Sequence, residues 1–411
     1  MKVEVIFQPE GKHARVKPSY SILEAAKLVG ADLLSICGGL GECGKCRVIV
    51  EKGKENAGSI TETEKVHLSP TELSMGYRLA CCTSVKGNLV VRVPEESRTG
   101  RQRLQVEGIE IPVKLEPLVQ KYFVQLPMPT LQDSRSDVDR LLDELHAQHC
   151  LENVKVSYNL LQRLPCILRD SEWKVTVTVW RSNEIFGIES GDTTDRTFGY
   201  AVDIGTTKLA GYLIDLSTGR LMAAGSLMNP QIHYGEDVMT RITYAMRGHK
   251  EQKELQQVVI AGINQILVDL CERTGVNSEE VYEMTAVGNT AMHHLFLNLC
   301  PKPLGLSPYT PVVRSGVNVK AESIRVNIKP DGNVHTLPVV AGFIGADNVA
   351  LILATEIYRR KELCMALDIG TNSEIVLGNK NEILACSCAS GPAFEGAHIR
   401  YGMRAGTGDC E

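Results

Sequence analysis

The sequence of 411 residues contains no run of 18 apolar residues, which argues against a transmembrane helix. It also lacks an excess of positive charge: its formal net charge is −5, which argues against a general nucleic-acid-binding protein. Residues 1–7 alternate polar and apolar side chains and have neither the apolar run nor the cleavage site of a signal peptide. We therefore expect a cytoplasmic protein that binds neither membranes nor nucleic acids.

A disulfide scaffold is excluded as well. The 13 cysteines are too sparse for one, their number is odd, and three of them cluster near the N-terminus. In a cytoplasmic chain such a cluster is typical of metal binding or redox chemistry. The 23% charged and 43% hydrophobic residues are ordinary for a globular protein, and the length indicates about two to four domains.

The cysteine cluster has a specific spacing. Cys37, Cys43 and Cys46 form the pattern C-x5-C-x2-C, and Cys81 or Cys82 offers a fourth thiolate from a distant segment. The glycines between the first three allow the backbone to wrap closely, with N–H groups directed at the sulfurs. Zinc is less favoured because structural zinc prefers two short cysteine pairs. A P-loop is rejected because Cys46 replaces the required hydroxyl residue and a strand, not a helix, follows.

Residues 1–95 resemble the adrenodoxin and putidaredoxin branch of the [2Fe–2S] ferredoxins. That branch shares the longer first gap and carries an Arg-Leu-x-Cys segment, which here runs from Arg78 to Cys81 and favours Cys81 over Cys82. The resemblance implies a β-grasp fold that binds one [2Fe–2S] cluster. The implied ligands are Cys37, Cys43, Cys46 and Cys81.

The next part of the chain carries no functional motif. Residues 96–125 are polar at first and then punctuated by prolines, which indicates a linker. Residues 126–197 are expected to form a small α/β module, because one apolar helical face begins at Val138 and residues 173–180 alternate like a strand with one buried face. We interpret this module as a spacer or docking domain.

Two similar segments later in the chain indicate phosphate binding. Asp-Ile-Gly-Thr occurs at residues 203–206 and again at 368–371, each time between apolar strands. An aspartate that ends a buried strand can bind Mg²⁺, directly or through water, while the glycine, hydroxyls and N–H groups that follow can hold a phosphate. One copy would be weak because Asp-Gly hairpin turns are common, but two copies favour two related halves that face each other.

This duplication resembles the superfamily of acetate and sugar kinases, heat-shock chaperones and actin, the ASKHA fold, in which two hairpins grip ATP phosphates from opposite subdomains. It implies a first subdomain over residues 198–362 and the start of a second over 363–411. We expect the second to be truncated, because a comparable half needs far more residues. The residues implied to bind ATP and Mg²⁺ are Asp203, Gly205, Thr206, Thr207, Lys208, Asp368, Gly370, Thr371 and Asn372.

Two further polar features lie between the hairpins. Asp347 follows a glycine-rich segment and could orient water or Mg²⁺, so that Asp203 and Asp347 are the expected catalytic residues; a helix N-cap is an equal alternative for Asp347. The polar loop of residues 229–237 could face the nucleotide, or Asp237 could simply pair with Arg241.

The order of these parts resembles the reductive activators of corrinoid-dependent methyltransferases, with a [2Fe–2S] ferredoxin domain, a linker, a middle module and an ASKHA domain. Segments 203–207, 229–231 and 389–396 look like that family's own sequence. The chain is thus expected to be an α+β and α/β multidomain protein. The resemblance implies ATP-dependent reduction of a Co(II) corrinoid to Co(I) in anaerobic one-carbon metabolism, with the cluster as electron donor and ATP driving a conformational change. The implied partners are a corrinoid protein and an electron-donating reductase or ferredoxin; a homodimer stays open.

The main alternative function is a [2Fe–2S] electron carrier whose ASKHA region is a non-catalytic docking platform, so that ATP would not affect corrinoid reduction. A kinase with an accessory cluster is less favoured, because no second substrate motif is present. An activator of a radical dehydratase would carry a bridging [4Fe–4S] cluster without an N-terminal ferredoxin, which the cysteine pattern argues against.

Overall fold

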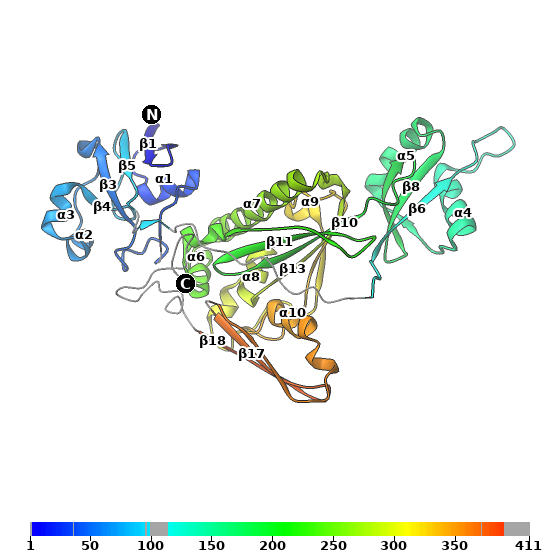
Figure 1. Ribbon diagram of the computed structural model, residues 1–411. Helices are drawn as coiled ribbons and strands as arrows, with labels where there is room; N and C mark the ends of the chain where they lie inside the picture. The colour runs from blue at the N-terminus through cyan, green and yellow to red at the C-terminus, as the bar shows by residue number, and fades with distance from the viewer. Residues whose placement is uncertain (1, 36, 95–96, 99–113, 371, 390–411) are drawn as a thin grey trace.

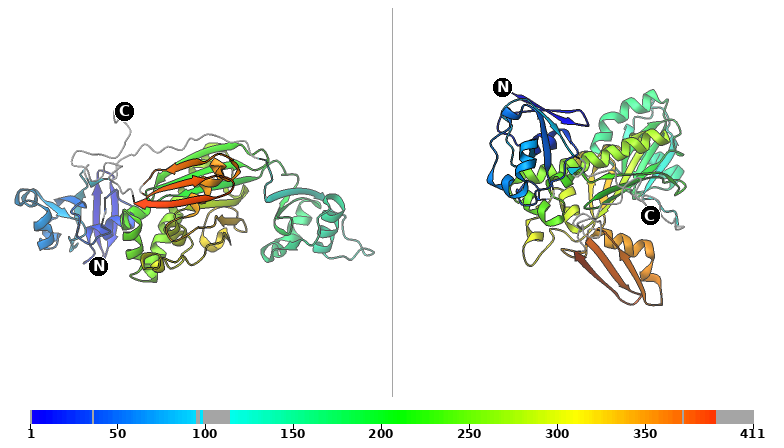
Figure 2. Two further views of the ribbon diagram at one scale, coloured as in Figure 1. Left: turned by 90° about the horizontal axis from the view of Figure 1, so that it is seen from below. Right: turned by 60° about the vertical axis from the view of Figure 1, so that its left-hand side comes forward.

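The computed structural model describes residues 2–35, 37–94, 97–98, 114–370 and 372–389. Its elements form three bodies in a row, with the N-terminal domain at one end, a smaller module at the other and the largest domain between them (Figure 1). Figure 2 shows the same succession from below. No helix in the described ranges is long and apolar enough to cross a membrane. The predicted α+β and α/β multidomain architecture is confirmed.

The N-terminal domain is a five-stranded sheet in the order β2-β1-β5-β3-β4, with the helix α1 packed against it. Only β1 and β5 pair in parallel. The side chain of Ser21 caps α1 by accepting from Glu24 N, and the Glu24 carboxylate accepts in turn from Ser21 N at 2.7 Å, which forms a capping box. The elements are β1 (Val3–Gln8), β2 (Lys12–Val16), α1 (Ile22–Val29), β3 (Arg47–Lys52), α2 (Glu62–His67), α3 (Pro70–Met75), β4 (Tyr77–Leu79) and β5 (Leu89–Arg92).

The smaller module is a four-stranded sheet in the order β6-β8-β9-β7, covered by two helices. The strand β6 (Val119–Gln125) lies within residues 96–125, the predicted linker, yet it pairs with β8 along its whole length. The sequence of β6 lacks the Val–Thr alternation that predicts β8. In β8 itself both faces are buried, including Thr176 and Thr178, so the expectation of one buried face is wrong there. The other elements are α4 (Asp137–His149), β7 (Lys155–Val156), α5 (Tyr158–Asp170), β8 (Lys174–Trp180) and β9 (Glu184–Ser190).

The central domain has a six-stranded sheet in the order β12-β11-β10-β13-β15-β14 and a separate three-stranded sheet, β16-β17-β18. The long helix α7 covers β11 and β12, with Leu255, Val259 and Ile263 in the core. The strands of the larger sheet are β10 (Phe198–Ile204), β11 (Lys208–Asp215), β12 (Leu221–Met228), β13 (Val281–Gly288), β14 (Val317–Lys320) and β15 (Asn333–Thr336).

The helices of the central domain cover this sheet and connect it to the smaller one, since α10 contacts both β13 and β16. They are α6 (Val238–Ala245), α7 (His249–Thr274), α8 (Thr290–Phe296), α9 (Ala321–Ile324) and α10 (Ala346–Thr355). The strands of the smaller sheet are β16 (Cys364–Asp368), β17 (Asn372–Gly378) and β18 (Ile383–Ala389). The two hairpins β10–β11 and β16–β17 therefore occur in separate sheets, as the duplicated motif predicts.

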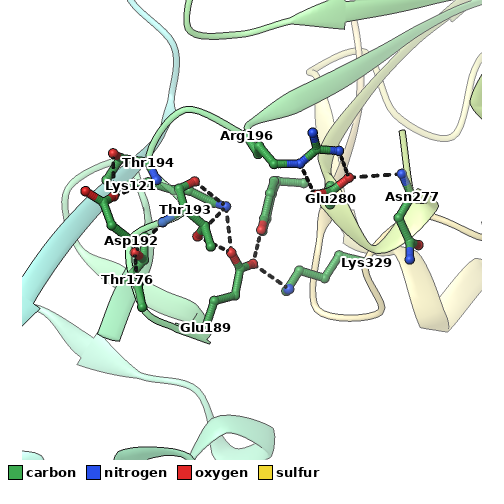
Figure 3. Close-up of polar contacts among 12 residues, drawn as sticks. Lys121, Thr176, Glu189, Asp192, Thr193, Thr194, Arg196, Asn277, Glu280 and Lys329 are labelled. Atoms are coloured by element: carbon green, nitrogen blue, oxygen red, sulfur yellow. Dashed lines mark hydrogen bonds and ion pairs between the residues drawn. The ribbon is translucent and has the colours of Figure 1, made fainter. Parts of the chain in front are cut away.

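A polar network centred on Glu189 joins the module to the central domain (Figure 3). Its carboxylate accepts from Lys121 Nζ of the module at 2.7 Å, and from Lys329 Nζ of the central domain at 3.2 Å. The hydroxyl of the buried Tyr282 also donates to it. Burial alone would raise the pKa of Glu189, but hydrogen bonds from Lys121, Thr193 and Tyr282 outweigh burial and hold this pKa at about 2.

We expect Glu189→Gln to lower the free energy of unfolding of the module by about 3 kcal/mol, because Lys121 would remain buried without a carboxylate. The depressed pKa of Glu189 means that its contribution is complete above the ordinary carboxyl pKa and is lost as pH falls towards about 2. The variant should therefore lose less stability than the wild type between about pH 5 and about pH 2.

Tryptophan fluorescence during denaturant unfolding reports on this module, because both tryptophans of the chain, Trp173 and Trp180, lie there. The exposed Glu152 of the same module supplies the control, Glu152→Gln. Equal stability losses in the two variants would contradict the role of Glu189.

Candidate functional sites: paired cysteines and facing aspartate hairpins

The predicted cluster ligands come together in the N-terminal domain. Cys37, Cys43 and Cys46 lie in the loop between α1 and β3, and Cys81 follows β4. The Sγ atoms of Cys37 and Cys43 are 3.4 Å apart, and those of Cys46 and Cys81 are 3.3 Å apart. The loop and the distant segment thus supply two pairs of sulfurs.

Two sulfur pairs suit a binuclear iron–sulfur cluster. Two sulfurs bound at about 2.3 Å to one tetrahedral metal lie about 3.8 Å apart, close to the distance within each pair. A [2Fe–2S] cluster held by four cysteines takes two thiolates on each iron. Within the described ranges, no three His, Cys, Asp or Glu side chains are placed to hold a single metal ion. The residues present therefore fit a [2Fe–2S] cluster with Cys37 and Cys43 on one iron and Cys46 and Cys81 on the other.

The backbone of the loop favours the thiolate form of Cys37. The Cys43 thiol and backbone hydrogen bonds from Gly39, Glu42 and Cys43 lower the pKa of Cys37, while the bond with Cys37 raises the pKa of Cys43. Gly44 adopts a φ of +64°, and a Cβ there would lie 2.8 Å from the His67 ring. Only glycine fits this position without strain.

The fourth ligand is a choice between adjacent residues. Cys82 Sγ lies 3.5 Å from Cys81 Sγ, and Cys81 is the residue whose sulfur pairs with Cys46. This geometry favours Cys81, and the ligand assignment stays a prediction.

A buried ion pair holds the segment that carries Cys81. Glu64 on α2 is fully buried and accepts from Arg78 Nε at 2.8 Å. Its carboxylate also accepts from Leu79 N and from Thr83 Oγ1, both at 3.1 Å. These donors stand on both sides of Cys81, so one carboxylate ties the two ends of the ligand segment to α2. Arg78, which identified this segment in the sequence, therefore has a positioning function.

We expect Glu64→Gln to destabilise the N-terminal domain by about 3 kcal/mol, because the buried Arg78 would lose its carboxylate partner. The measurement is the denaturant concentration at which the visible absorption of the reconstituted cluster disappears under anaerobic conditions. Glu62→Gln is the matched control, since Glu62 lies on the same helix with its side chain 87% exposed. A midpoint for Glu64→Gln equal to that of the control would contradict this prediction.

The first aspartate hairpin joins β10 and β11. Asp203 lies at the end of β10, Thr206 and Thr207 form the turn, and Lys208 begins β11. A Cβ on Gly205 would lie 2.6 Å from Lys208 O, so the turn requires glycine. In this turn the backbone of Gly205 packs closely against that of Lys208. The turn is the part of the hairpin that is expected to approach a phosphate.

The second hairpin repeats this arrangement. Asp368 ends β16, Gly370 lies in the turn and Asn372 begins β17. Thr371, also predicted to bind phosphate, lies outside the described residues. Glu374, which the sequence analysis did not select, is the cross-strand partner of Asp368.

The acidic groups of both hairpins act on one another. Burial, and then the charge of Asp368, raise the pKa of Asp203 to about 6. Burial, and then the charges of Glu374, Asp203 and Asp368, raise the pKa of Asp347 to about 7. The two hairpins and α10 therefore face a common space. Gly345 is the N-cap of α10, so the N-cap alternative for Asp347 is wrong.

Several buried carboxylates in one space favour a cation there. Mg²⁺ typically uses one or two carboxylates together with nucleotide phosphates and waters, and does not need a complete protein cage. In keeping with this, no three acidic side chains of the described chain converge closely enough to hold one ion. A cavity of about 240 Å³ lies beside the second hairpin, where Asn372 and Glu374 line it together with Asn289, the residue that donates to Thr206 of the first hairpin. The residues present thus fit Mg²⁺ bound with a phosphorylated nucleotide.

Two asparagines brace the first hairpin. Asn289 Nδ2 donates to Thr206 Oγ1 at 2.9 Å, and Asn229 Nδ2 donates to Gly205 O at 2.8 Å. The loop of residues 229–237 therefore reaches the predicted phosphate loop. Asp237 caps α6 through Thr240 N, and the described part of the chain contains no ion pair between it and Arg241.

Glu374 and Asn289 were missed as site residues, and Asn229 was predicted only as part of the polar loop of residues 229–237 that could face the nucleotide. The signal for Glu374 was its position opposite Asp368 in the predicted hairpin, which places both acidic side chains on the same face of the strands. The two asparagines lie far from the first hairpin in the sequence and reach it only in the folded chain. No spacing in the sequence indicates that they bond to it.

Comparisons with known proteins assign a family model to each part of the chain. Four family models match successive parts of the chain: a 2Fe-2S iron-sulfur cluster binding domain over residues 5–86, the RACo linker region over 108–195, the RACo middle region over 198–360 and the C-terminal ASKHA domain of RACo over 362–411. The chain belongs to the RACo family. The predicted family, the [2Fe–2S] domain and the ASKHA domain are thereby confirmed.

Two similar proteins match along all or nearly all of the chain. The corrinoid activation enzyme RamQ of Eubacterium limosum is 29% identical over 410 residues, which are 100% of this chain and 65% of RamQ. The solved structure of a reductive activator for corrinoid,iron-sulfur protein is 34% identical with a TM-score of 0.66, covering 98% of this chain and 65% of that one. The chain thus spans about 65% of the length of each relative.

The N-terminal domain has further relatives outside the RACo family. It is 49% identical over 67 residues to a component of the Na(+)-translocating NADH-quinone reductase of Yersinia enterocolitica, a match to 16% of each chain. The ferredoxin-type domain therefore has counterparts in other redox proteins, and the matches specific to the RACo family lie within residues 108–411.

Proposed function

We propose that this chain carries out ATP-dependent reductive activation of corrinoid proteins. The observation that carries the proposal is the presence, on one chain, of two cysteine sulfur pairs and two facing aspartate hairpins. Each feature alone would support only an electron carrier or only a nucleotide-binding protein. The similarity to RamQ and to a reductive activator for corrinoid,iron-sulfur protein supports the combination.

The residues divide into two groups. Cys37, Cys43, Cys46 and Cys81 hold the [2Fe–2S] cluster, which when bound and reduced supplies one electron. The first hairpin holds phosphate and Mg²⁺ through Asp203, Gly205, Thr206, Thr207 and Lys208. The second opposes it through Asp368, Gly370, Thr371 and Asn372, and Asp347 orients Mg²⁺ or its water from α10.

A bound, reduced cluster would supply the electron that converts the Co(II) corrinoid of a partner protein to Co(I), and a separate reductase or ferredoxin would in turn supply electrons to the cluster. This transfer is energetically uphill, so it requires a coupled favourable process. A nucleotide can supply this favourable process if it binds more tightly to one conformation of the complex than to another. We place this chemistry in the cytoplasm, where reduced partners are available.

The experiment is anaerobic reduction of a Co(II) corrinoid protein by the reduced chain, followed by visible absorption with and without Mg–ATP. We expect the Co(I) band to appear only with Mg–ATP. Redox cycling of the cluster without any ATP effect would contradict this function and favour the alternative, an electron carrier with a non-catalytic ASKHA region.

A further inference from the structure

The cluster loop rests on the central domain at the short 3-10 helix η3 (Pro230–Tyr234). A Cβ on Gly38 would lie only 2.6 Å from Tyr234 O, and the φ of Gly38 is +64°. His233 Nδ1 lies 3.1 Å from Leu33 O. Because Gly38 directly follows Cys37, η3 touches the chain at the first cluster cysteine.

A lysine anchors the same contact. The ammonium of Lys27 on α1 lies 4.5 Å from the centre of the Tyr234 ring and 5.2 Å from that of Tyr244. Burial, together with the nearby charge of Arg247, lowers the pKa of Lys27 to about 8. Figure 1 shows α6, which carries Tyr244, beside the N-terminal domain. The ferredoxin-type domain thus places a cation against two tyrosines of the central domain, whose rings contact each other.

The other end of η3 is attached to the first phosphate hairpin. Asn229 is fully buried, and its backbone N–H donates to Thr207 O at 2.8 Å while its Nδ2 donates to Gly205 O at 2.8 Å. Its Oδ1 accepts from Gln231 N at 3.0 Å and so caps η3. The buried Asn229 therefore both bonds to the first hairpin and caps the start of η3.

Buried side chains brace η3 between these ends. Arg241 is fully buried and donates from Nε to Gly235 O at 2.8 Å and from Nη1 to Gln231 Oε1 at 3.2 Å. Gln231 Nε2 donates in turn to Leu255 O of α7 at 3.0 Å. These bonds cross-link η3, so that a displacement at Asn229 moves the segment as a unit and reaches His233 and Tyr234.

We propose that η3 links nucleotide binding at the first hairpin to the seating of the cluster domain on the central domain. Asn229 is the nucleotide end of this link, and Lys27 with Leu33 and Gly38 is the cluster end. A nucleotide that shifts Gly205 or Thr207 alters the bonds of Asn229 and thereby changes how tightly the cluster loop is held. By linkage, loosening the cluster end changes the affinity for nucleotide by the same factor. This inference rests on the proposed function for its ligand, but the mechanical link can be tested without nucleotide.

The first experiment measures hydrogen exchange of the cluster-loaded chain without nucleotide. Asn229→Ala should speed exchange of the Leu34 and Gly38 amides of the cluster domain. The control is Asn264→Ala, because Asn264 also bonds two backbone groups, Arg325 O and Asn327 N, away from both hairpins. Unchanged exchange at Leu34 and Gly38 in Asn229→Ala would overturn the link.

The second experiment measures the dissociation constant for Mg–ATP by titration calorimetry. Lys27→Met should change it by about fivefold or more, while Lys86→Met, at an exposed lysine of the same domain, should not. Equal affinity of Lys27→Met and wild type would overturn the inference and leave the proposed function intact. If the wild type binds no Mg–ATP although the exchange result holds, the proposed function fails while the mechanical link survives.

Discussion

Cys46→Ser should abolish the visible absorption of the reconstituted cluster, or shift it strongly, and should end electron transfer to a corrinoid partner. Cys46 is buried, and its sulfur lies 3.3 Å from that of Cys81, so it has no nearby replacement on the loop. A serine oxygen is a poorer ligand for iron than a thiolate, because soft sulfur ligands are preferred in these clusters. The measurement is the absorption and EPR spectrum of the reduced, anaerobically reconstituted variant.

Cys82→Ser is the matched control, because Cys82 lies beside the proposed fourth ligand and its sulfur is 3.5 Å from that of Cys81. We expect this variant to keep the spectrum of the wild type. An unchanged spectrum in Cys46→Ser would contradict the ligand set. A spectrum lost in Cys82→Ser and kept in Cys81→Ser would move the fourth ligand to Cys82.

Asp203→Asn should weaken binding of Mg–ATP by about 100-fold while leaving the cluster spectrum unchanged. Asp203 lies at the end of β10, and burial together with the charge of Asp368 raises its pKa to about 6, although the charge of Lys208 opposes this shift. Asparagine keeps the size of the side chain but removes the charge that binds Mg²⁺, directly or through water. Titration calorimetry with Mg–ATP measures the effect.

Asp269→Asn is the control for this prediction, because Asp269 lies on the exposed side of α7 with its side chain 62% exposed. The outcome against the nucleotide role is an Asp203→Asn affinity equal to that of the control. Loss of the cluster spectrum in Asp203→Asn would instead indicate a folding role for this residue.

The cluster site could be predicted in detail because its chemistry is local. Three ligands lie within a short loop, and the glycines needed for that loop are visible in the sequence. Arg78 also indicated the segment that carries Cys81, but the sequence did not show what Arg78 does there. It pairs with the buried Glu64, which comes from a helix of unremarkable sequence. A buried ion pair depends on which segments of the chain pack together, and the spacing of residues in the sequence does not show this.

The nucleotide site could be predicted only in part. The duplicated Asp-Ile-Gly-Thr motif located both hairpins, because each motif reports its own turn. Asp347 was left between two roles, and the N-cap position of Gly345 decided against one of them. Asn289 was missed as a site residue, and Asn229 was predicted only as part of a polar loop, because their partners, Thr206 and Gly205, are far away in the chain.

The sequence by itself determined the parts of this protein: a ferredoxin-type cysteine loop, two aspartate hairpins and the RACo order of domains. These features depend on local spacing, on turns that require glycine and on strands that carry their own apolar pattern. The tertiary structure alone decided that Glu374 and Asp347 share the space of the hairpins, that Glu189 joins the module to the central domain, and that η3 lies between Gly205 and the cluster loop. Such contacts join residues from distant segments, and only packing of the whole chain brings them within hydrogen-bonding distance.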